Sequence, residues 1–193
     1  MLAAAVLLQL AIHSGRSAAQ KPQPADVVQK LYREVVARHP MGVPHGADKT
    51  SIWPFLSKRL ISAFETRNAC DKDWDRKHPY SEEHPMKPPG FYEDGLFSGS
   101  DELGYINGAE LGSTKEQSDG SYLVYVKLWS YLDMGEPSLR SSGKIYRWQV
   151  AARVTSEDGK FVVDDILLFN YDKSVYMSKM LTSGCRGTHS TSD

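Results

Sequence analysis

The sequence lacks the short motifs that mark many enzymes and most nucleic-acid binders. It has no nucleophile elbow, phosphate-binding loop or zinc-protease motif. Its 23 lysine and arginine residues are balanced by 24 acidic residues, so it lacks the basic excess that binding along nucleic-acid phosphates requires. Beyond residue 19, no run is apolar enough to cross a membrane. We therefore expect neither a nucleic-acid partner nor a membrane span.

The overall composition is typical of a globular protein. Of the 193 residues, 40% are apolar and 24% are charged, which does not fit a disordered chain. A chain of this length suits one domain and buries roughly 70% of its unfolded surface. We predict a single domain over residues 20–182, followed by a polar tail over 183–193.

The first nineteen residues have the pattern of a secretory signal peptide. Residues 2–12 form an apolar run that is about 16 Å long as a helix, too short for a bilayer core of about 30 Å. The small residues Ser17 and Ala19 suit cleavage before Gln20. No basic residue precedes the run, and the alternative is a buried N-terminal helix. The pattern predicts an exported protein, periplasmic or secreted, with residues 1–19 removed.

Export determines how the two cysteines are interpreted. In an oxidising compartment an even cysteine count favours a disulfide, and Cys70 and Cys185 form the one pair available. Such a bond would close a loop of more than 100 residues, which the chain-entropy model values at about 4–5 kcal/mol. Two free thiols are the alternative.

Hydrophobic periodicity changes from helical to strand-like along the chain. Residues 24–39 and 52–69 repeat apolar side chains at helical spacing, with Ser51 placed to cap the second helix. Prolines and glycine then predict a long loop over 70–98. Alternating patterns and an Asp-Gly turn at Asp158 predict a hairpin-rich sheet, and a short helix follows. The expected strands span 105–111, 122–133, 143–155 and 161–169, and the last helix spans 173–181.

This order predicts an α+β fold in which two N-terminal helices cover one face of a curved antiparallel sheet. The string GKFVVDDI at 159–166 resembles the final hairpin of the nuclear-transport-factor-like, or cystatin-like, roll. More narrowly, the chain is similar to a bacterial exported family of unknown function. The matching strings are NAC at 68–70, KPPG at 87–90 and DGLFS at 94–98. The resemblance covers most of residues 25–182 and implies no catalytic residues.

An acidic string within the predicted loop has calcium-ligand spacing. Asp71, Asp73, Asp75 and Glu82 occupy positions 1, 3, 5 and 12 of a twelve-residue loop, where calcium needs hard oxygen ligands. Arg76 stands where such a loop needs glycine, and the alternative is a solvated acidic loop. No other cofactor is expected.

Histidines in the same predicted loop raise the question of zinc. His78 and His84 flank Glu82 and Glu83, and these residue types bind zinc. Surface histidines are the alternative.

Aromatic residues supply the remaining candidates for a binding site. We expect Tyr32, Tyr125, Trp129, Tyr131 and Trp148 to contribute to ligand binding, while the two tryptophans also suit a packed core. The predicted function is an exported, non-catalytic binding module that holds a protein or small ligand of the cell envelope on the concave sheet face or the long loop.

The alternative function is a small-pocket enzyme of isomerase or hydrolase type. Such an enzyme would use a carboxylate base, Asp164 or Asp165, with a tyrosine donor. Because these two aspartates are adjacent in a strand, we expect them on opposite faces of the sheet. No residue is assigned as catalytic.

Overall fold

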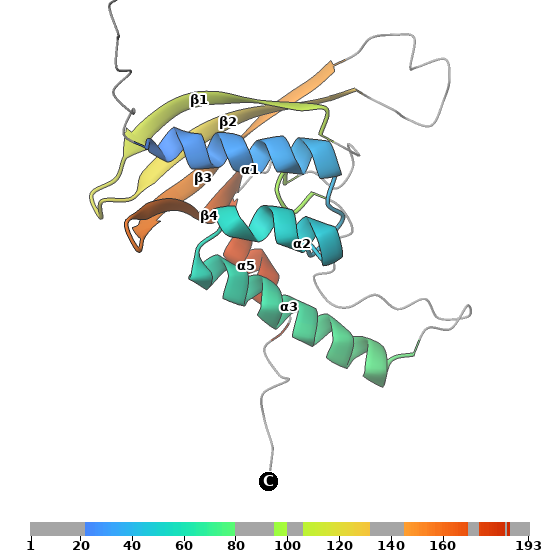
Figure 1. Cartoon of the computed structure of the whole chain (residues 1–193). Helices are drawn as coiled ribbons and strands as arrows, with labels where there is room; N and C mark the ends of the chain where they lie inside the picture. Colours follow the sequence, from blue (N-terminus) through green and yellow to red (C-terminus); the bar gives the residue numbers. More distant parts are fainter. Residues whose placement is uncertain are drawn as a thin grey trace, which may run out of the picture.

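The computed structural model describes residues 22–79, 95–99, 106–131, 145–169, 174–183 and 185. Helices come first and a five-stranded antiparallel sheet follows, with a short helix after it, which confirms the α+β class (Figure 1). The predicted signal peptide and nearly all of the polar tail lie outside the described residues. In the described part of the chain, no helix is both long enough and apolar enough to cross a membrane.

The first helix begins at the predicted residue and ends one residue earlier than predicted. Helix α1 spans Pro24–Arg38, with proline in its first turn, where no N–H is needed. The Asp26 carboxylate accepts a hydrogen bond of 2.8 Å from the Gln23 backbone N–H. The residue after the helix, His39, caps its C-terminus in a left-handed conformation with φ of 48°. Its inner stripe includes Val28, which is fully buried.

The prediction of one helix over 52–69 is wrong. Helix α2 spans Gly46–Ile52, the 3-10 turn η1 spans Trp53–Phe55, and helix α3 spans Lys58–Lys77. Pro54 lies in η1, where its ring and its missing N–H interrupt the α-helical bonds. Ser57, and not Ser51, caps the long helix, because its hydroxyl accepts a hydrogen bond of 3.0 Å from the Leu60 N–H.

The predicted loop over 70–98 begins too early. Helix α3 continues through Cys70 to Lys77 and stops just before Pro79, the first residue that excludes it. An ion pair at i, i+4 spacing supports this extension, with Arg67 and Asp71 2.8 Å apart. At the other end of the predicted loop, residues 95–99 are described and enter the core: Phe97 is 2% exposed and stacks on Phe64 at 5.8 Å.

The sheet is a meander in which each strand pairs with the next. The strand order is β1 to β5, and the bounds are β1 Gly108–Glu116, β2 Tyr122–Tyr131, β3 Ile145–Glu157, β4 Lys160–Phe169 and β5 Ser174–Tyr176. The Asp-Gly hairpin is confirmed, since Asp158 and Gly159 have φ of 51° and 76°. Strand β1 starts three residues later than predicted and runs five residues further.

The last predicted helix is partly wrong. Its first residues form β5, and helix α5 spans only Met177–Thr182.

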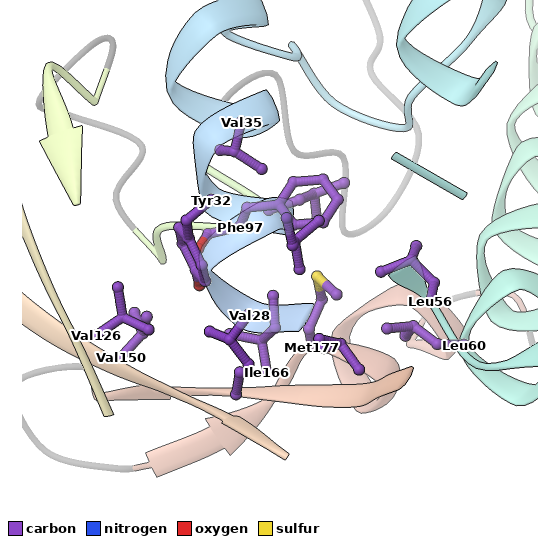
Figure 2. Close-up of a cluster of buried hydrophobic side chains, with 14 of the residues drawn as sticks. Val28, Tyr32, Val35, Leu56, Leu60, Phe97, Val126, Val150, Ile166 and Met177 are labelled. Atoms are coloured by element: carbon purple, nitrogen blue, oxygen red, sulfur yellow. The ribbon is translucent and has the colours of Figure 1, made fainter. Parts of the chain in front are cut away.

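The core lies between the helices and one face of the sheet. In Figure 1, α1 lies along the sheet, and α2, α3 and α5 lie on the same side of it. Figure 2 shows Val28 and Tyr32 of α1 above strand residues, and every labelled side chain in this cluster is less than a tenth exposed. Alternate strand positions such as Val126, Val150 and Ile166 point into this layer and are fully buried.

The predicted disulfide is present. Cys70, in α3, is bonded to Cys185, which follows α5, with 5.7 Å between the Cα atoms. The bond joins positions 115 residues apart and links the helical half of the chain to its C-terminal end.

Candidate ligand-binding groove

The five aromatic residues predicted to bind a ligand lie on both faces of the sheet. Tyr32 and Trp148 are on the helix side, where the Trp148 indole donates a hydrogen bond of 2.9 Å to the Ser98 carbonyl. Strand pairing places Tyr125, Trp129 and Tyr131 on the opposite face, because each alternates with a buried residue of β2. The five residues therefore do not form a single site.

Cations lie over two of the outer-face rings. Tyr125 stacks on Phe169 at 6.4 Å, and the Lys115 ammonium is 5.3 Å from the Tyr125 ring centre. The Arg147 guanidinium is 5.9 Å from the Trp129 ring centre. Tyr131 remains the most exposed large apolar side chain among the described residues, at 56%.

The structure does bring Tyr32 and Trp129 to one groove, between α1 and the edge strand β1. The groove has a volume of about 720 Å³. Its α1 wall is a single helical stripe, since the residues recur at i, i+3, i+4, i+7 and i+8. That stripe consists of Gln29, Tyr32, Arg33, Val36 and Ala37.

The opposite wall consists of four successive residues of β1, Gly108, Ala109, Glu110 and Leu111. Successive strand side chains point to opposite faces of a sheet, so a cavity that touches all four must lie along the edge of the strand. In the described part of the sheet, β1 pairs with β2 on one side and has no neighbour on the other. The groove therefore runs beside an open strand edge.

Trp129 of β2 also lines the groove. Its indole lies on the backbone of Gly108, its cross-strand partner, so closely that a Cβ atom at residue 108 would be 1.9 Å from the ring. Glycine is the one residue that leaves room for this ring position. The ring thus packs across β1 at Gly108 and also lines the groove.

The groove is mainly apolar and has two opposite charges on its walls. Arg33 on α1 and Glu110 on β1 are both exposed, and neither forms an ion pair with another described residue. The buried Tyr32 hydroxyl donates a hydrogen bond of 2.9 Å to the Phe97 carbonyl. Burial raises the pKa of Tyr32 far above its usual range, so the phenol stays protonated.

The prediction that Asp164 and Asp165 face opposite sides of the sheet is wrong. A β-bulge in β4 leaves Asp164 without a cross-strand partner, and bulges redirect side chains. Both carboxylates contact Arg59, with N–O distances of 2.9 Å to Asp164 and 3.1 Å to Asp165. Asp164 also accepts a hydrogen bond of 2.9 Å from Ser57. None of these residues lines the groove.

Asp165 has a second role at the start of α5. Its carboxylate accepts hydrogen bonds from the Ser178 N–H at 3.0 Å and from the Ser178 hydroxyl at 2.5 Å. The two aspartates thus join the starts of α3 and α5 to β4. Both carboxylates are thus engaged in contacts between elements of the fold.

The calcium-loop geometry is wrong where it can be checked. Asp71, Asp73 and Asp75 lie on α3, and Glu82 lies outside the described residues. Asp73 pairs with Arg76 and, at 2.7 Å, with Lys77. Among the described residues, no three or more metal-ligating side chains lie together in a group that could hold an ion.

Only one residue of the proposed zinc set is described. His78 stacks on Trp74 with 3.9 Å between the ring centres, while Glu82, Glu83 and His84 lie outside the described residues.

Most of the groove was not found by sequence reasoning. Gln29 and Arg33 do not belong to the apolar pattern of residues 24–39, and the strand expected over 105–111 does not indicate which element its edge faces. Their shared location depends on how α1 crosses the sheet edge. Comparison of the chain with protein-family models, curated proteins and solved structures gives no match. The cystatin-like roll therefore stays a prediction.

Proposed function

We propose that this protein is an exported, non-catalytic binding domain that holds its ligand in the groove between α1 and β1. The observation that carries this proposal is the groove itself. Its volume of about 720 Å³ falls within the range of small-ligand sites, which is about 300–1,000 Å³. A largely apolar lining with a few polar groups is also typical of such sites.

The lining favours binding over acid–base catalysis. Arg33 carries a guanidinium, which donates hydrogen bonds and has no acceptor atom, so it is a poor general base. Tyr32 already donates its proton to a backbone carbonyl. Glu110 has no hydrogen-bond partner among the described residues, whereas a catalytic carboxylate is usually held by a second group. Asp164 and Asp165, the bases of the enzyme alternative, are bound to Arg59.

The disulfide supports export. Structural disulfides persist in oxidising compartments and are rare in the cytosol of most organisms. The Cys70–Cys185 bond is consistent with the leader-like pattern of residues 1–19. Secretion of a reporter fused after residue 19 would support this part of the proposal, and a cytosolic, uncleaved product would contradict it.

A fragment screen by NMR tests the groove. We expect fragments that combine an apolar group with a carboxylate to bind. Their addition should change the backbone amide chemical shifts mainly at Arg33, Val36 and Glu110. Val36→Trp should fill the groove and remove these shifts. Lys72→Trp adds the same side chain at an exposed position of α3 and should leave them unchanged. Shifts that survive Val36→Trp, or the absence of any binder, would contradict the proposal.

A further inference from the structure

We propose that the ligand of the groove is an extended peptide that adds to the open edge of β1 as a further strand. This inference rests on the proposed function and narrows its ligand class. Strand addition needs an unpaired edge beside a groove that receives alternate side chains. Residues 108–111 supply both, because they line the groove consecutively and pair with β2 on one side only among the described strands.

The rest of β1 is protected against strand addition. The pairing of β1 with β2 shifts between Leu111 and Thr114, which marks an irregularity. Lys115 and Glu116 follow on the same strand. Bulges and charged residues are the devices by which sheets prevent unwanted edge pairing. The part of the edge that precedes the irregularity is residues 108–111, about 13 Å at ~3.3 Å per residue, and Glu110 is the charged residue within it.

The two sides of the groove suit an extended peptide whose successive side chains point in opposite directions. Side chains directed toward α1 would meet an apolar surface that includes Val36 and Leu111, with Tyr32 buried beneath it. Side chains directed the other way would meet Trp129, whose ring reaches the same edge. Main-chain hydrogen bonds to β1 would supply affinity for any sequence, and these two surfaces would select apolar residues.

Arg33 adds a charge preference. Its guanidinium lines the groove from α1 and forms no ion pair with a described residue. A carboxylate on the helix side of the peptide complements it through a charge-assisted hydrogen bond. The inferred partner is thus an extended segment with alternating apolar residues and an acidic residue facing α1.

A library of capped heptapeptides tests this inference, with apolar residues at alternate positions and Asp or Lys at the centre. We expect Asp peptides to bind the full chain by fluorescence polarisation. Arg33→Glu should reverse the preference in favour of Lys. Val36→Trp should abolish binding, and Lys72→Trp should not.

N-methylation of the peptide backbone provides the decisive measurement. In an added strand every second N–H faces β1, so methylation at those positions should weaken binding about tenfold or more, while methylation at the intervening positions should have little effect. Equal tolerance at all positions would overturn strand addition. Apolar fragments that bind without any peptide doing so would overturn it too, and would leave the proposed function standing.

A second copy of the chain is the alternative occupant of the β1 edge, and sedimentation distinguishes it from a peptide. Sedimentation of the full chain should show a monomer at the concentrations used for peptide binding. A concentration-dependent dimer that Val36→Trp disrupts would overturn the peptide proposal, because β1 would then pair with its own copy.

Discussion

The indole of Trp129 lies on the backbone of Gly108, and the two residues are cross-strand partners in β1 and β2. A Cβ atom at residue 108 would be 1.9 Å from the ring, so any side chain there must displace the indole. The displaced ring would also leave the Arg147 guanidinium that lies 5.9 Å from its centre.

Gly108→Ala should therefore lower the free energy of unfolding by about 1–3 kcal/mol, the usual cost of overpacking. Urea denaturation followed by circular dichroism measures this value. In a Trp129→Ala background the added methyl has room, so the cost of Gly108→Ala should largely disappear. Additive effects of the two substitutions would show that the ring and the glycine are not coupled.

Loss of the disulfide should destabilise the protein without changing its fold. The Cys70–Cys185 bond spans 115 residues, and removing such a bond costs about 2–5 kcal/mol. Denaturation of Cys70→Ala/Cys185→Ala should give this loss, with unchanged secondary structure by circular dichroism. Reductant should lower the stability of the wild type and leave that of the double variant unchanged. A wild type indifferent to reductant would contradict the prediction.

Asp164 should contribute stability that depends on pH. Burial acts to raise its pKa, but hydrogen bonds from Arg59 and Ser57 outweigh burial and hold the pKa below its usual range. Folding therefore favours the ionised carboxylate. Its contribution is complete above the unfolded pKa of about 3.9 and is lost as the pH falls through the lower folded value.

Asp164→Asn should cost about 1–3 kcal/mol at pH 7, and the cost should shrink as the pH falls below about 4. Urea midpoints across this range measure the effect. Asp158→Asn is the matched control, since that carboxylate pairs with Lys58 on the surface and both side chains are 79% exposed. This variant should change stability little, because exposed ion pairs contribute little. A loss of stability in Asp164→Asn that does not vary with pH would contradict a stabilising role for the ionised Asp164 carboxylate.

Local pattern determined much of the fold before any tertiary contact was known. Helical spacing over residues 24–39 predicted α1 almost to the residue, because its apolar stripe and terminal residues are local signals. The hairpin at Asp158 and Gly159 was equally readable, since an Asp-Gly pair suits a turn with two positive φ angles. The cysteine pairing followed from there being only two cysteines.

Sequence patterns were less reliable where neighbouring signals compete. The pattern over residues 52–69 suited one helix, yet the chain forms η1 at Trp53–Phe55 and Leu56 pairs with Val163 of β4. The acidic string after Cys70 resembled a calcium loop, yet helical ion pairs extend α3 through it. Both outcomes depend on contacts with distant segments or with the next helical turn.

The sequence by itself determined the α+β class, the first helix, the Asp-Gly hairpin and the cysteine pair, because each depends on residues close in the chain or on a simple count. The tertiary structure alone decided the location of the groove. Arg33 and Glu110 are 77 residues apart, and only the crossing of α1 over the edge of β1 places them on facing walls. The bulge at Asp164 likewise reverses a side-chain direction that strand alternation predicts.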